Sequence, residues 1–174
     1  MSSNFAELES SVEPLGMASG FVNEFADAVQ SQPMFEGFTQ EETALFSEYL
    51  ECYGVSRQAV VVREGDEGNF LAILVTGRAM VLKNYKGVEK MVQELTPGEM
   101  IGEMSLIDGQ KRFASCVAIE PSDFAVMTSE NLNALLAQHP ALGNKFLMKL
   151  LGLSTARLRR ATEMMLPGLM HVAV

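Results

Sequence analysis

The feature that most constrains the fold is a series of short apolar segments between residues 58 and 128. These segments are rich in Val, Ile, Leu, Phe and Ala, and Gly, Asp, Asn and Pro separate them. They cover residues 59–63, 70–75, 78–84, 89–95, 113–119 and 123–127. Apolar runs of this length that are bounded by turn residues are typical of strands. Several short strands at this spacing predict a β-barrel or a β-sandwich.

Helical patterns precede this β-rich region. Apolar residues recur at helical spacing between Phe21 and Val29, which predicts a first helix. The sequence from Thr39 to Glu42 has the form of a capping box, in which each side chain binds the backbone of the other residue. It predicts a second helix that extends to about residue 52. We expect both helices to pack on the sheet.

Two further helices are expected after the strands. Ser129 is a suitable N-cap for a helix to about residue 138, and Pro140 is suited to the first turn of a longer helix that ends before Pro167. The longer helix has a broad apolar surface, which comprises Leu142, Phe146, Leu147, Leu150, Leu151, Leu153 and Leu158. This surface either packs on its own domain or also pairs with a second subunit, and its width favours a homodimer through the C-terminal helix.

The length of 174 residues suits one domain. Residues 1–19 are rich in Ser, Glu, Gly and Pro, and we expect them to form a mobile tail. The domain is expected over residues 20–166, with helices in 20–54, strands in 55–128 and the C-terminal helices in 129–166. Residues 167–174 are expected to form a second tail. The expected fold class is therefore α+β.

The charge distribution argues against a nucleic-acid partner. The net charge is −9, and residues 1–51 carry ten Asp or Glu but no Lys or Arg. Binding to nucleic acid normally requires a basic face that releases counterions from phosphates. No charge-free apolar stretch reaches the roughly 18 residues that a membrane span needs, and there is no signal-peptide pattern. We expect a soluble cytoplasmic protein with no membrane partner.

Enzymatic and metal chemistry lack a suitable set of residues. Ser105 has no Gly-x-Ser-x-Gly setting, and His139 and His171 are isolated from it and from each other. Cys52 and Cys116 lie far apart and have no neighbouring ligand that would suggest a metal site. We therefore expect no catalytic residue, no bound metal and no cofactor.

One segment has the chemistry of a sugar-phosphate site. Residues 102–116 place the carboxylate of Glu103 and the guanidinium of Arg112 at the two ends of a turn. Backbone N–H groups at a helix start favour an anion, and a guanidinium offers a planar fork of donors to phosphate oxygens. Without further context, a solvated surface charge is the alternative interpretation of each residue. In either interpretation Arg112 is expected on a solvent-accessible turn.

This segment resembles the phosphate-binding cassette of the cyclic nucleotide-binding domain family. The resemblance continues in an acidic glycine turn at residues 64–69, a strand-glycine-strand hairpin at 70–81, the approach at 95–103 and the exit at 112–115. It extends over roughly residues 35–165. It implies that the strands form a β-barrel of the jelly-roll type, with N-terminal helices and a long C-terminal helix around it.

The resemblance also implies roles for individual residues. Glu103 would accept a hydrogen bond from the ribose 2′-hydroxyl, and Gly102 would keep the backbone before it free of side-chain bulk. Arg112 would be the counter-charge to the cyclic phosphate. Further contacts, from backbone N–H groups and van der Waals walls, are expected from Met104, Ser105, Phe113 and Ala114.

The base-recognition features are less typical of the family. Cyclic-GMP-preferring members carry a Thr after the arginine, whereas Phe113 has no hydroxyl, so cyclic AMP is favoured over cyclic GMP. The ring of Phe113 either narrows the pocket or stacks on the base. In the family a C-terminal lid helix often contacts the base, and the candidates here are Thr162, Arg157, Arg159 and Arg160.

The resulting hypothesis is a non-catalytic cyclic AMP receptor that signals to an unknown downstream protein or to its dimer mate through movement of the C-terminal helix. Two alternatives remain open. One is a protein interaction module in which Phe113 closes a degenerate pocket, and the other is a sensor of a cyclic dinucleotide.

Overall fold

The computed structural model describes residues 12–169, and in this part of the chain two antiparallel sheets are flanked by helices. The five-stranded sheet has, in spatial order, β1 (Val12–Met17), β2 (Glu51–Val55), β9 (Ser122–Thr128), β4 (Phe70–Thr76) and β7 (Met100–Ile101). The four-stranded sheet has β3 (Val60–Val62), β8 (Ser115–Ala118), β5 (Ala79–Tyr85) and β6 (Val88–Leu95). The helices are η2 (Ala18–Phe21), α1 (Val22–Val29), η3 (Pro33–Phe35), α2 (Gln40–Ser47), α3 (Glu103–Asp108), α4 (Ser129–Gln138) and α5 (Pro140–Leu169).

Strand β4 shows why its sequence is an unbroken apolar run. Leu71 and Ile73 belong to a core cluster that includes side chains of α1, α2, α4 and α5. Phe70 and Leu74 belong to a second cluster, formed between the two sheets. Because one face of the strand meets helices and the other meets a sheet, neither face tolerates polar residues.

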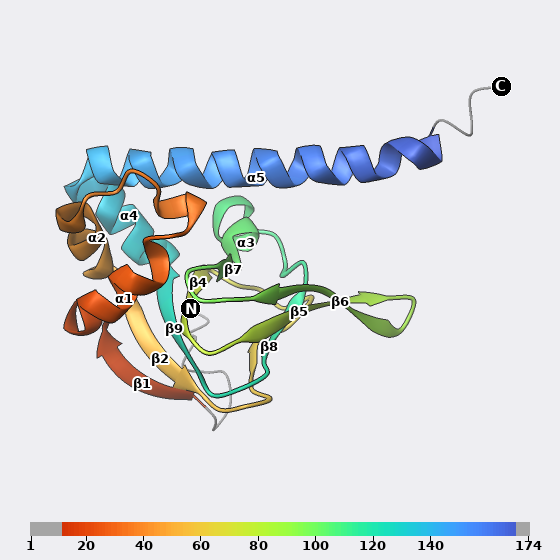
Figure 1. Ribbon diagram of the computed structural model, residues 1–174, viewed down its shortest axis with the longest axis horizontal. Coiled ribbons are helices and arrows are strands. Elements are labelled where there is room, and N and C mark those ends of the chain that lie inside the picture. Colours follow the sequence, from red (N-terminus) through yellow and green to blue (C-terminus); the bar gives the residue numbers. More distant parts are fainter. Residues whose placement is uncertain (1–11, 170–174) are drawn as a thin grey trace.

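The helices lie mainly on one side of the molecule. In Figure 1, α1, α2 and α4 gather at one end, and α5 passes above α3 and continues beyond the sheets. The predicted capping box of α2 is confirmed: Thr39 Oγ1 accepts from the Glu42 amide at 3.1 Å, and Glu42 Oε2 accepts from the Thr39 amide at 2.8 Å. The β5–β6 hairpin projects from the same side as the far end of α5.

The expectations for the N-terminal region need two corrections. Residues 12–17, expected in a mobile tail, form strand β1 and pair with β2. Residues 51–54, expected in the helical region, belong to strand β2, because α2 ends at Ser47. Strand β1 has no clear strand pattern in the sequence, because its residues are mostly exposed. The strand also contains Pro14 and Gly16, which are unusual in strands. Residues 1–11 of the expected tail lie outside the described residues.

The six expected strands are confirmed with small shifts at their ends, and β7 is an additional short strand. Helix α4 has Thr128 rather than Ser129 as its N-cap, since Thr128 Oγ1 accepts from the Asn131 amide. Helix α5 continues through Pro167 instead of ending before it. Residues 167–169 are therefore helical, and residues 170–174 of the expected tail lie outside the described residues. The α+β organisation is confirmed, whereas the jelly roll and the domain limits stay predictions.

Candidate functional site

Helix α3 begins where the backbone turns sharply after β7. Gly102 is the N-cap of α3 and has a φ of +86°, in the left-handed region that favours glycine. Glu103 follows as the first helical residue, and only 5% of it is exposed. This turn therefore directs a carboxylate into the protein interior at the start of a helix.

Arg112 lies in the chain segment that leads into β8. The structure corrects the expectation of a solvent-accessible turn, because only 4% of Arg112 is exposed. Its Nη1 donates to Phe70 O at 2.8 Å and to Gly102 O at 3.0 Å. Its Nη2 is buried and has no hydrogen-bond partner among the described residues. A buried donor without an acceptor costs about 1 to 3 kcal/mol.

The backbone around Arg112 is fitted to the guanidinium. A Cβ atom at Gly68 would meet the Arg112 guanidinium, and a Cβ at Gly102 would meet Arg112 Nη1. The guanidinium carbon lies 4.2 Å from the centroid of the Phe70 ring. The Arg112 amide also donates to Asp66 O at 2.8 Å, which ties the acidic glycine turn to the same segment. We call Gly68, Phe70, Gly102, Glu103 and Arg112 the Arg112 site.

The electrostatics of the Arg112 site follow from burial. Loss of hydration lowers the pKa of Arg112 to about 10, and the negative charges of Glu103 and Asp66 oppose this shift. Arg112 therefore remains protonated at neutral pH although it is buried. An anion at the site would interact strongly with this guanidinium, because little water competes for its hydrogen bonds.

A contact with α5 is the feature that sequence reasoning missed. Arg157 of α5 forms an ion pair with Glu103 through Nη1 and Oε1. The two residues are 54 positions apart in the chain. The sequence marks Arg157 only as a candidate for contact with a base. Its position on the predicted lid helix was the only signal for this pairing.

The other predicted site residues fall into two groups. Ser105 and Ala114 are buried near the Arg112 site, whereas Met104 and Phe113 are exposed, Phe113 to 57%. Lys83 Nζ lies 4.3 Å from the centroid of the Phe113 ring and donates to Phe113 O at 2.6 Å. Lys83 also pairs with Glu64 at 2.7 Å. The ring of Phe113 is therefore placed beside β5.

Thr162 is not brought to the Arg112 site by any described contact. It is exposed on α5, and its hydroxyl donates to Leu158 O within the same helix. Arg159 and Arg160 are also exposed. Among the three arginines of this helix, only Arg157 forms an ion pair in the described part of the chain.

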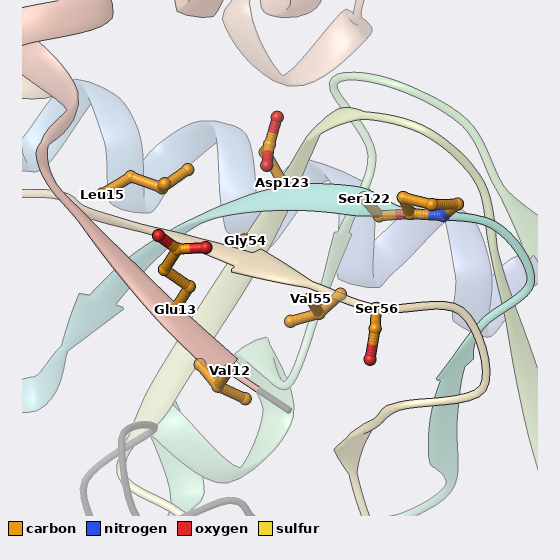
Figure 2. A pocket seen from close by; sticks show the side chains of 9 residues that line it. Val12, Glu13, Leu15, Gly54, Val55, Ser56, Ser122 and Asp123 are labelled. Carbon is orange, nitrogen blue, oxygen red and sulfur yellow. The ribbon is translucent and has the colours of Figure 1, made fainter. Parts of the chain in front are cut away.

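Among the described residues no group of His, Cys, Asp and Glu is arranged to hold a metal ion, and no helix is long and apolar enough to cross a membrane. A hollow of about 540 Å³ lies on strands β1, β2 and β9, beside Gly54. Figure 2 shows the residues that line it. Glu13 and Asp123 are its charged lining residues. It is therefore unsuited to a phosphate, in contrast to the Arg112 site.

Comparisons with known proteins agree with this geometry. The sequence model described as Cyclic nucleotide-binding domain matches residues 52–139. The solved structure of a cyclic nucleotide-binding domain from Methylobacillus flagellatus is 35% identical, with a TM-score of 0.82, and the match covers 97% of each chain.

Two curated relatives are longer than this chain. The Cyclic AMP receptor protein of Thermus thermophilus is 30% identical over 134 residues, which are 76% of this chain and 60% of the relative. The cAMP-dependent protein kinase regulatory subunit of Mycosarcoma maydis is 34% identical over 93 residues, which are 53% of this chain and 18% of the relative. The chain thus spans less than two thirds of either protein.

Proposed function

The chain belongs to the cyclic nucleotide-binding domain family, and from this premise we propose that it is a non-catalytic receptor for cyclic AMP. The buried Nη2 of Arg112, which has no partner among the described residues, is the observation that carries the proposal. The two exocyclic oxygens of a cyclic phosphate would offer acceptors to this nitrogen. The bound phosphate would remove the cost of an unsatisfied buried donor.

Glu103 is proposed to bind the ribose. Its carboxylate is buried and begins the helix that follows Gly102, within one turn of the carbonyl that Arg112 holds. An ionised carboxylate accepts several hydrogen bonds, so a ribose hydroxyl could bind beside Arg157 or in its place. Phe113 offers no hydroxyl to a guanine amino group, and this supports cyclic AMP over cyclic GMP.

Signalling is proposed to pass through α5. The first half of α5 is held by Lys145, which donates to Gly37 O and Glu42 Oε2, each at 2.6 Å. Its second half is held by the pair of Arg157 with Glu103. A ligand that binds Glu103 therefore changes the interactions of α5 directly. Such differential contact is what a ligand needs in order to shift a conformational equilibrium.

We also propose that α5 forms a homodimer. Exposed residues of α5 recur at alternating steps of three and four, the spacing of a coiled-coil seam. They are Met148, Leu151, Thr155, Leu158, Thr162 and Met165. The face that packs on the domain carries Leu142, Phe146 and Leu150 instead, and these are buried. A second α5 would cover the exposed apolar seam.

Calorimetric titration with cyclic AMP and cyclic GMP tests the proposed receptor. We expect saturable binding of cyclic AMP that is weakened by about 2 to 5 kcal/mol in Arg112→Ala, because a desolvated charge partner is lost. Lys111→Ala, which removes an exposed charge next to it, should bind as the unmodified protein does.

Folding must be checked, because Arg112→Ala also removes the donor for two carbonyls. Arg112→Lys keeps the charge but loses the planar fork, and it should bind with intermediate affinity. Unchanged cyclic AMP affinity in folded Arg112→Ala would refute the phosphate assignment. Absence of binding by the unmodified protein would instead favour an interaction module or a cyclic dinucleotide.

A further inference from the structure

A groove lies at the helical end of the molecule, away from the Arg112 site. Residues of α1, η3 and α2 line it, and its volume is about 850 Å³. Val29 and Phe35 are buried lining residues, and Ala26, Phe38 and Ala44 are half-buried. The groove thus has an apolar floor that suits an aliphatic or aromatic side chain of another molecule, and polar side chains such as Asn23, Gln30 and Gln40 also line it.

Carboxylates dominate the charge of the segments that line this groove, and the two lysines Lys145 and Lys149 of α5 lie at one edge of it. The described part of the N-terminal region, residues 12–51, contains eight Asp or Glu and no Lys or Arg. Two exposed carboxylates line the groove, Asp27 from α1 and Glu36 from the turn after η3. Asp27 forms no ion pair among the described residues, whereas Glu36 Oε2 lies 3.6 Å from Lys149 Nζ, so the excess of carboxylates favours a further cation near Asp27.

The groove shares residues with the contact surface of α5. Gly37 and Phe38 line the groove, and Lys145 of α5 donates to Gly37 O and lies 4.9 Å from the Phe38 ring centroid. Lys149 of α5 lies 3.6 Å from Glu36 Oε2, a longer contact than that of Lys145 with Glu42. A shift of α5 would therefore change both the shape of the groove and the charge available in it.

We propose that this groove binds a basic amphipathic segment of a partner protein. Apolar side chains of the segment pack on Val29 and Phe35, and its Lys or Arg side chains pair with Asp27 and, in place of Lys149, with Glu36. Nucleic acid is disfavoured because its phosphates would be repelled. The groove itself stands on geometry and charge alone, whereas its control by nucleotide through α5 rests on the proposed function.

A labelled 14-residue helical peptide of Leu and Lys serves as the probe. Fluorescence anisotropy without nucleotide should show saturable binding to the full chain. Asp27→Asn/Glu36→Gln should weaken binding by about tenfold, equivalent to about 1.4 kcal/mol. The matched control, Glu13→Gln/Glu48→Gln, removes the same charge outside the groove and should remain within about twofold.

Occlusion provides an independent variant. Ala44→Trp fills the groove without changing its charge. This variant should also bind the peptide more weakly, and it should still bind cyclic AMP. Equal weakening in the charge variant and its control, or no saturable binding, would overturn the proposal. Self-association that disappears in Asp27→Asn/Glu36→Gln would also overturn it, because a second copy would then be the occupant.

Nucleotide addition separates this inference from the proposed function. Cyclic AMP should change the peptide affinity several-fold, and Arg112→Ala should bind peptide but lose this response. If cyclic AMP does not change the peptide affinity, the groove still binds the peptide, but the proposed control of this binding through α5 is wrong. If the unmodified protein binds cyclic AMP normally but does not bind the peptide, the proposed peptide site is wrong and the proposed receptor function stands.

Discussion

At the scale of single residues, Gly68 and Arg112 depend on each other. The guanidinium occupies the space that a side chain at Gly68 would need. Glycine at this position is thus required by close approach and not by a turn conformation. Sequence reasoning identified the acidic glycine turn at 64–69, but it had no means of linking that turn to an arginine 44 positions later.

We predict that Gly68→Ala weakens cyclic AMP binding by at least about tenfold, because the new methyl group displaces the guanidinium from its position. Titration calorimetry and thermal unfolding measure binding and folding separately. Gly20→Ala is the matched control, since a Cβ there has no heavy atom within 4 Å. Equal affinity for both variants would show that the position of the guanidinium does not control binding.

At the scale of elements, α5 connects the Arg112 site to the N-terminal helices. Arg157 contacts Glu103, Lys145 contacts Glu42 of α2, and Lys149 contacts Glu36 in the turn after η3. Exposed ion pairs contribute little to stability, but the pair with Glu103 has one buried member. We therefore propose that Arg157 positions the second half of α5 and that Lys145 and Lys149 hold its first half in place.

Arg157→Ala should separate binding from signalling. We expect cyclic AMP affinity to change by less than about tenfold, or 1.4 kcal/mol, since Arg112 remains in place. Hydrogen exchange of residues 150–165 should become faster in the free protein, and its response to cyclic AMP should be lost. Arg159→Ala removes an exposed charge two residues away and should keep that response. A retained response in Arg157→Ala would contradict the positioning role.

At the scale of the whole molecule, the exposed seam of α5 determines the expected assembly. Light scattering should give a mass of about twice the 19.0 kDa of the chain. Leu158→Glu places a charge in the seam and should give the single-chain mass, because burial of an unpaired charge is costly. Ala156→Glu adds the same charge to an exposed position of α5 outside the seam and should remain dimeric. A single-chain mass for the unmodified protein would refute the dimer.

The sequence by itself determined the features that have a local signal. Six strands and the capping box of α2 followed from periodicity and spacing, whereas the ligand roles of Glu103 and Arg112 are predictions from the family resemblance. Strand β1 was missed because an edge strand with exposed residues lacks the alternation that burial imposes.

Only the tertiary structure decided the burial of Arg112 and the pairing of Glu103 with Arg157. It also gave α5 two different faces, one that packs on the domain and one that is exposed. These properties depend on contacts between residues that are distant in the chain. Local sequence patterns report which groups are present, but the packing of sheets and helices determines which groups lose water and which partners they meet.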